Sequence, residues 1–366
     1  MVWGNLPMAH VVDPGYQLLA AKYLRRQAKQ LAEQFEGVRA AEDIEFVHRA
    51  RVATRRLRAA LRMFDDCFPA RRIKQWRKAI RRITAELGDA RDRDVQIDLL
   101  CGVLSSATSK ACFPGIARLL VHLEHQRERL QRKVVKAIKR LEADNVLCEV
   151  QRMTKDILAA AESAQLGVQS PAAYARAEEH ILRRWDDLRQ QEASLADADD
   201  QQGHHVMRIA TKRLRYTVEI VRPVYAGRLD EPLEAIKRVQ TLLGEIHDCD
   251  VWLEHLDEFA ARERKRIVSQ FGHAGPFARL HAGIEYLRQD RRTRRRQVFD
   301  ELAAYWAELG RQAFWEHLVA TVRARGAEAA TAQPGPASPP PGGNGRGEMP
   351  SPGADRNDEP ALTSGS

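Results

Sequence analysis

Apolar residues recur every three or four positions along most of the chain before residue 325, which is the spacing of one face of an α-helix. No run of alternating apolar and polar residues has the length of a β-strand. The pattern therefore predicts an all-α protein. The predicted helices span, by residue number, about 14–35, 41–68, 73–88, from 92 onward, 116–161, 172–195, 204–225, 231–243, 248–271 and 276–322.

Prolines and glycines mark the expected helix boundaries. Pro14 is placed to open the first helix and Pro69 to end the second. Gly88 is predicted to be a helix C-cap. Asp92 and its counterpart Asp248 are predicted to be the N-caps of the helices that follow. Residues 165–171 are predicted to be a linker between two modules.

One segment of the second predicted helix is repeated, with few changes, in the second half of the chain. Residues 48–58 read HRARVATRRLR, and residues 205–215 read HVMRIATKRLR. A second pair follows in the same order, LGDARDRDV at 87–95 and LGEIHDCDV at 243–251. Two ordered motifs at nearly one offset indicate a tandem duplication, and the unit is too long for a solenoid repeat. We expect two similar four-helix-bundle-like modules related by pseudo-twofold symmetry, about 14–165 and 170–322.

The repeated segment carries a row of positive charge. On a helix its cations fall within an arc of roughly 80°, opposite the apolar residues. Like charges at this spacing repel by a few tenths of a kcal/mol per pair, so a row that recurs in both halves is typical of an anion site. A solvated basic face is the alternative interpretation. The rows comprise His48, Arg51, Arg55, Arg58 and Arg62 in the first half, and His205, Arg208, Lys212 and Arg215 in the second, where Glu219 replaces Arg62.

Composition supports a polyanionic partner. The 366 residues carry a net charge of +9. The segment 326–366 is acidic and holds half of the 16 prolines, so the positive excess lies in the helical part. An excess of this kind favours nucleic acid, an anionic membrane surface or a phosphate polymer as partner. The Pro/Gly-rich segment has too little apolar surface to fold and is predicted to be a disordered tail.

The sequence favours a cytoplasmic location. The first residues lack the basic and apolar segments of a signal peptide, and no apolar run is long enough for a membrane span. The five cysteines show no CxxC spacing and are expected to be reduced thiols.

At the two motif pairs the chain resembles the CHAD family, the conserved histidine α-helical domain. The resemblance covers roughly residues 14–322, without an N-terminal triphosphate-tunnel (CYTH) domain. It implies two four-helix bundles with a basic central groove or pore that binds inorganic polyphosphate. By the same resemblance the binding residues are His48, Arg51, Arg55, Arg56 and Arg58 with His205, Arg208, Lys212, Arg213 and Arg215. Arg62 is added on helix geometry, and Arg81 and Lys237 are further candidates.

Polyphosphate has no base edges to read, so guanidinium forks and ammonium groups along a groove are sufficient to bind it. The histidines His48 and His205 can gain charge beside phosphate, which predicts tighter binding at mildly acidic pH. Each can instead be a structural residue near a helix start. Neither has a second His or Cys at the spacing of a metal site, and no cofactor is expected.

Two further groups of charged residues and the absence of catalytic motifs bear on the function. The pairs Asp92/Asp94 and Asp248/Asp250 are read as structural rather than as Mg²⁺ ligands. The basic run 291–296 is interpreted as a solvated face, with an extension of the anion site or a contact with nucleic acid as the alternatives. No phosphate-binding loop, HExxH motif or nucleophile elbow is present, so we expect a binding protein and not an enzyme.

Two alternative functions stay open at this point. The first is a nucleic-acid-binding basic helical protein, although aromatic residues make up only 6% of the chain and the basic rows contain none. The second is an interaction protein located on polyphosphate or other storage granules, for which the tail could serve. The oligomeric state is not indicated by the sequence.

Overall fold

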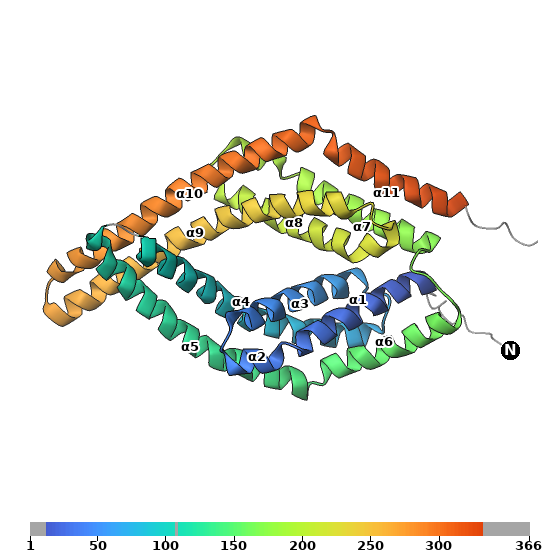
Figure 1. The fold of residues 1–366 in the computed structure, drawn as a ribbon, viewed down its shortest axis with the longest axis horizontal. Coiled ribbons are helices and arrows are strands. Elements are labelled where there is room, and N and C mark those ends of the chain that lie inside the picture. Colours follow the sequence, from blue (N-terminus) through green and yellow to red (C-terminus); the bar gives the residue numbers. More distant parts are fainter. Residues whose placement is uncertain (1–11, 107–108, 332–366) are drawn as a thin grey trace, which may run out of the picture. The chain divides into compact units, whose positions relative to one another are not determined.

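The structure is a computed structural model that describes residues 12–106 and 109–331. Within these residues it contains helices and connecting turns and no strand (Figure 1). This confirms the all-α prediction. The predicted disordered tail lies outside the described residues except at its start, where the last helix continues to Thr331 and corrects the predicted boundary.

The described part of the first half of the chain, residues 12–106 and 109–163, contains six α-helices. They are α1 (Pro14–Ala32), α2 (Phe35–Ala40), α3 (Ile44–Met63), α4 (Ala70–Ser106), α5 (Phe113–Ala143) and α6 (Val146–Ser163). Five α-helices follow in the described part of the second half. They are α7 (Pro171–Arg189), α8 (Gln201–Val221), α9 (Asp230–Phe271), α10 (Ala278–Arg311) and α11 (Phe314–Thr331). Short 3-10 turns flank several of them.

The two halves pack their helices in the same way. In the first half α1 packs against α3 and α6, α3 against α4, and α4 against α5. In the second half α7 packs against α8 and α11, α8 against α9, and α9 against α10 (Figure 1). Five helices of the first half thus have counterparts with equivalent neighbours among the described helices of the second half, and α2 is the exception. The pseudo-twofold symmetry and the repeat boundaries remain predictions.

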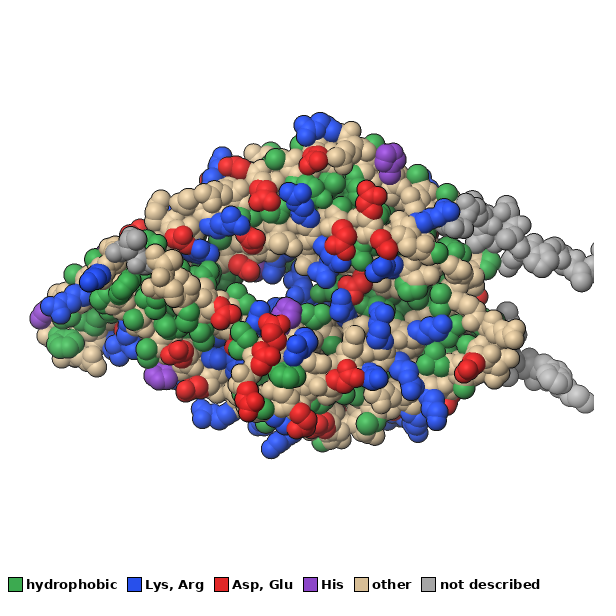
Figure 2. Space-filling view, in the orientation of Figure 1, with side chains coloured by type: hydrophobic (Ala, Val, Ile, Leu, Met, Phe, Trp, Pro, Cys, Tyr) green, Lys and Arg blue, Asp and Glu red, His purple; other side chains and the backbone are tan. Residues whose placement is uncertain are grey.

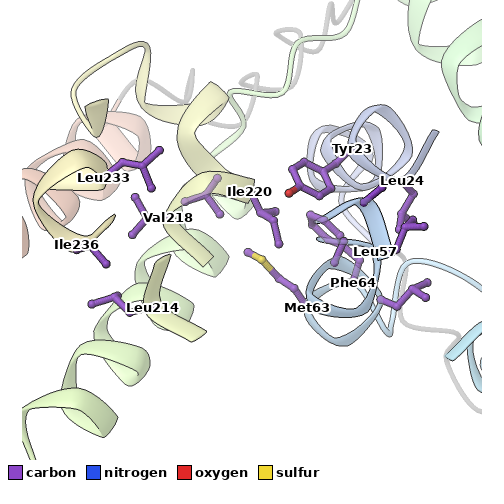
Figure 3. Close-up of a cluster of buried hydrophobic side chains, with 14 of the residues drawn as sticks. Tyr23, Leu24, Leu57, Met63, Phe64, Leu214, Val218, Ile220, Leu233 and Ile236 are labelled. Carbon is purple, nitrogen blue, oxygen red and sulfur yellow. The ribbon is translucent and has the colours of Figure 1, made fainter. Parts of the chain in front are cut away.

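Buried apolar side chains line the inner faces of α3 and α8. Leu57 and its counterpart Leu214 are 1% and 0% exposed. Removing such a side chain from water contributes about 1.5–3 kcal/mol. Figure 3 shows Met63 and Ile220 pointing toward each other between the two halves. Because the apolar faces of both helices are used by the core, their cationic faces point elsewhere.

The predicted helix ends at Gly88 and at Leu243, just before Gly244, are wrong. Each glycine lies inside one long helix, α4 or α9. A glycine in a helix costs about 0.5–1 kcal/mol relative to alanine, and burial of the residues on either side offsets this. Leu87 and Leu243, which precede the two glycines, are fully buried.

Several other predicted boundaries also change. Asn145 (φ 53°) and Ala313 (φ 49°) adopt left-handed backbone and divide two predicted helices, 116–161 and 276–322, each into two. The predicted first helix, 14–35, ends at Ala32, and a short helix that was not predicted, α2, follows it. None of these divisions has a proline or glycine at its turn, which is the signal that the sequence reading relied on.

The halves contact each other at both ends as well as through α3 and α8. Ser170, which caps α7, donates to the carboxylate of Asp13, which caps α1, at 2.5 Å. At the other end α5 packs on α10, where Gly115 and Gly283 let the two backbones touch. Among the described residues, none of the helices combines the length and apolar character needed to cross a bilayer.

Candidate anion-binding site

Capped helix starts position the two motif helices. The Asp43 side chain accepts a hydrogen bond from the Glu45 backbone N–H at 2.8 Å and begins α3. The Asp200 side chain accepts from the Gly203 backbone N–H at 2.8 Å and begins α8. Such caps satisfy backbone donors that the first helical turn leaves free. With their apolar faces in the core, α3 and α8 pack against each other and place cationic residues in one cavity.

This basic cavity has a volume of about 940 Å³ and is formed by α3, α4, α5, α8 and α9. Figure 2 shows Lys, Arg and His side chains around a hollow between the two halves. Eight Arg and Lys side chains line it against three Asp side chains. The lining residues are His48, Arg51, Arg55, Asp89, Arg91, Asp92, Arg93, Val95, Gln96, Gln126, Arg129, Leu130, Lys133, Arg208, Lys212, His247, Asp248, Val251 and Trp252.

Cations from both halves act on one another within the cavity. Burial lowers the pKa of Arg55, and the nearby Arg51 and Arg208 lower it further. Burial likewise lowers the pKa of Arg208, to which Arg51 adds while Asp248 opposes. Guanidinium groups that repel each other across the interface between the halves are stabilised when an anion lies between them.

Lys212 is strongly affected by burial and by the neighbouring cations of the cavity. Burial lowers the pKa of its ammonium to about 7, and Arg55, Arg208 and Arg51 contribute further while Asp248 opposes. The ion pairs formed by the described residues do not include Lys212. No carboxylate contact therefore stabilises the protonated form of Lys212, and a bound anion would stabilise it.

The two motif histidines occupy different positions. His48 lines the cavity, where burial lowers its pKa and Arg91 adds to the effect. His205 lies behind the lining, with its Nδ1 3.4 Å from Nδ1 of His247. Burial lowers the pKa of His247 to about 4, followed by the effect of Arg208. In the free protein the rings of His48 and His247 are therefore less basic than an ordinary histidine.

Aspartates of the second motif form ion pairs with arginines. Asp92 does not cap a helix, because it lies inside α4, and neither does Asp248 inside α9. Instead Asp92 lies 3.6 Å from Arg51. Asp92 is therefore an ion-pair partner of a motif arginine and not a helix cap.

The second aspartate of each motif joins neighbouring helices. Asp94 pairs with Arg127 on α5 at 2.6 Å, and Asp250 pairs with Arg295 on α10 at the same distance. Within residues 12–106 and 109–331, no group of three His, Cys, Asp or Glu side chains is arranged to hold a metal ion. Asp94 and Asp250 each hold an arginine of a neighbouring helix in an ion pair.

Other predicted residues lie outside the lining of the basic cavity. Arg56 pairs with Glu219 and lines a separate cavity of about 500 Å³, together with Lys237. Arg215 donates to Gln240 at 3.1 Å and lies 3.8 Å from Glu219. Glu219 therefore neutralises part of the second row, which the sequence had suggested by its departure from the pattern.

The remaining predicted cations form a second group. Burial lowers the pKa of Arg58, and the charge of Arg81 lowers it further. Burial also lowers the pKa of Arg62, with added effects of Arg58 and Arg213. This group combines both halves but does not line the basic cavity.

The sequence reading missed four cations of the basic cavity. Arg91 and Arg93 belong to the second motif, whose positive charges were overlooked beside its aspartates. Arg129 and Lys133 lie one turn apart on α5, outside both motifs, and only the packing of α5 on α4 identifies them.

The dense basic run on α10 is largely ion-paired, and its interpretation as a solvated face is wrong at Arg295, which is buried against Asp250. Arg294 pairs with Glu245 at 2.6 Å, and Arg296 pairs with Asp300 at 3.3 Å. No residue of the run lines the basic cavity.

Comparisons with known proteins agree with this architecture. The family model of the CHAD domain matches residues 22–257. A crystal structure of the CHAD domain from the plant Ricinus communis superposes with a TM-score of 0.56 at 22% identity, covering 79% of this chain and 90% of that one. PptA from Streptomyces chartreusis superposes with a TM-score of 0.53 at 16% identity, covering 79% and 98%. No curated protein sequence matches the chain.

Proposed function

Because this chain belongs to the CHAD domain family and both motif helices direct cations into one cavity, we propose that it binds inorganic polyphosphate there. The observation that carries the proposal is the convergence of Arg51 and Arg55 on α3 with Arg208 and Lys212 on α8. These residues come from opposite halves of the chain. A site that needs both copies of a repeated motif suits a ligand that is itself repetitive.

The physical properties of the cavity fit a phosphate chain. Planar guanidinium groups hold two phosphate oxygens at once, and one helix presents a cation about every 5 Å along its axis. The eight cations of the lining exceed its three carboxylates, so a bound polyanion would remove mutual repulsion in the free protein. Counterions released from the chain would add to the affinity.

The proposed role is binding without catalysis. The carboxylates best placed in the cavity, Asp92 and Asp248, lie beside Arg51 and Arg208. Used in this way, they are poorly suited to act as a general base or as a metal pair. A cytoplasmic location, free or at polyphosphate granules, belongs to the same proposal.

Calorimetric titration tests the proposal. Polyphosphates of graded length are titrated at two salt concentrations into the wild type and into Arg51→Glu/Arg208→Glu. The double variant is expected to lose at least about 100-fold in affinity, since two charge-assisted contacts become repulsive. Wild-type affinity should rise with chain length and fall steeply with salt.

The matched control is Arg292→Glu/Arg296→Glu, which changes the net charge equally on exposed positions of α10. It should retain most of the affinity. Equal losses in both double variants would contradict a defined cavity. A competition assay addresses nucleic acid, which polyphosphate should displace at a far lower phosphate concentration than the reverse.

A further inference from the structure

A second cluster of imidazole and guanidinium groups lies beside the basic cavity. It is formed by His122 on α5, His255 and Arg262 on α9, and Arg93 on α4. Gln126 connects it to the cavity, because Gln126 lines the cavity and its Nε2 lies 2.7 Å from Nε2 of His122. Arg93 belongs to the second motif and also lines the basic cavity, whereas His122, His255 and Arg262 lie outside both motifs.

His255 is the most unusual member. Its side chain is 9% exposed, and neither ring nitrogen has a hydrogen-bond partner among the described residues. The buried Nε of Arg93 is also without a partner there. Buried polar groups in native proteins are almost always satisfied by protein, water or a ligand. Two such groups at one place therefore indicate a bound polar species.

The surroundings of His255 are positively charged. Burial lowers the pKa of His255 to about 4, and Arg93, Arg262 and His122 all lower it further. Burial also lowers the pKa of His122, followed by Arg262, while Glu263 opposes. A cluster of this composition disfavours a cation and favours an anion.

The carboxylates near the cluster either pair with arginines outside it or act on Arg93. Glu263 accepts from Arg118 at 2.9 and 3.0 Å and from Arg266 at 2.9 Å. Burial lowers the pKa of Arg93, which Asp92, Asp89 and Glu258 oppose, whereas the charges that act on His255 are those of Arg93, Arg262 and His122. The carboxylates nearby therefore leave the centre of the cluster, at His255, without a negative charge.

We propose that His122, His255, Arg262 and Arg93 form a second anion site for a terminal phosphate group, that of orthophosphate or of the end of a linear polyphosphate. A terminal phosphate presents three acceptor oxygens and nearly two negative charges, which suits donors converging from three helices. A phosphate inside a chain carries one charge and needs room on two sides. The exposed Arg262 leaves one side of the site open.

The chain-end form of this inference rests on the proposed function, whereas the orthophosphate form does not. The test uses three probes: orthophosphate, linear tripolyphosphate and cyclic trimetaphosphate, which has no chain end. They are titrated calorimetrically into the wild type, His255→Gln, Arg262→Gln and the control His125→Gln, an exposed histidine on α5. Circular dichroism verifies folding, and Arg262→Gln decides the outcome if His255→Gln is misfolded.

For a chain-end site, linear tripolyphosphate should bind at least about tenfold more weakly to His255→Gln and Arg262→Gln, with trimetaphosphate unchanged. For an orthophosphate site, the same variants should lose orthophosphate binding. In both cases His125→Gln should behave as the wild type.

The inference is overturned if both site variants bind orthophosphate and tripolyphosphate as the wild type does, or if they lose the linear and cyclic probes equally. The variant Arg51→Glu/Arg208→Glu separates the two proposals. Its loss of long-chain binding tests the basic cavity, while its retention of orthophosphate tests the second site independently.

Discussion

Arg56 on α3 and Glu219 on α8 form an ion pair between the two halves, with Nε and Oε1 2.5 Å apart. The Glu219 side chain is only 12% exposed and also lies 3.8 Å from Arg215. Tyr23 on α1 approaches the same carboxylate at 3.5 Å. A residue that interrupts the second basic row thus connects three helices at the centre of the molecule.

Replacing this carboxylate should destabilise the protein. Glu219→Gln leaves Arg56 and Arg215 close together without a counter-charge, and we expect the free energy of unfolding to fall by about 1–3 kcal/mol. Urea denaturation followed by circular dichroism measures it. Glu234→Gln is the control, since it removes an exposed pair with Lys237 and should cost less than about 1 kcal/mol. Equal effects would show that the Glu219 pair adds no stability.

The contact between Gly115 and Gly283 predicts a destabilising alanine substitution. A Cβ at Gly283 would lie 2.2 Å from the carbonyl oxygen of Cys112, which is backbone and cannot move aside cheaply. We expect Gly283→Ala to lower the stability by about 1–3 kcal/mol. Gly244→Ala is the matched control, because no atom lies within 4 Å of its Cβ. That variant should instead gain about 0.5–1 kcal/mol from helix propensity.

Lys212 predicts how polyphosphate binding depends on pH. Its pKa of about 7 in the free protein means that the ammonium loses its proton as pH rises through 7. A bound anion raises that pKa, so binding above pH 7 must take up a proton. Affinity should therefore decrease by up to about tenfold per pH unit between pH 7 and 8.5. Lys212→Arg, which stays charged, should flatten the calorimetric profile, and an unchanged profile would assign the dependence elsewhere.

His247 predicts a loss of stability in acid. Its pKa is near 6.5 in the unfolded chain and about 4 in the folded protein, so the unfolded chain binds the proton first. The stability contribution is complete above pH 6.5 and is lost as pH falls toward 4. Since the imidazole remains partly solvated, we expect about 1–2 kcal/mol. Thermal unfolding at pH 7.5 and 5 measures the loss, which His247→Gln should reduce.

The pKa of Lys212 offers a different cause than the motif histidines for the tighter polyphosphate binding predicted at mildly acidic pH. His48 faces the cavity, but burial and Arg91 lower its pKa, so it gains charge only at a lower pH than an ordinary histidine. The ammonium of Lys212 titrates in the neutral range instead. A lysine surrounded by arginines was not distinguishable from any other lysine of the row before its burial was known.

Local patterns in the sequence were sufficient to predict the helical class and the sides of the motif helices that carry charge. The apolar stripe through Leu57 and Leu214 depends only on helix periodicity, and the cationic rows follow on the opposite side. The repeat of both motifs likewise predicted two halves with equivalent elements. Five of the predicted residues indeed line one cavity: His48, Arg51, Arg55, Arg208 and Lys212.

Only the tertiary structure decided which charges act together and which helices continue. Arg56 and Arg58 lie beside Arg55 and Leu57 in one motif, yet the packing of α3 on α8 and α4 directs them away from the basic cavity. Helices α4 and α9 continue past Gly88 and Gly244 because the neighbouring apolar residues are buried in the core. Periodicity is a property of a few consecutive residues, whereas desolvation, ion pairing and convergence depend on residues that are distant in the chain.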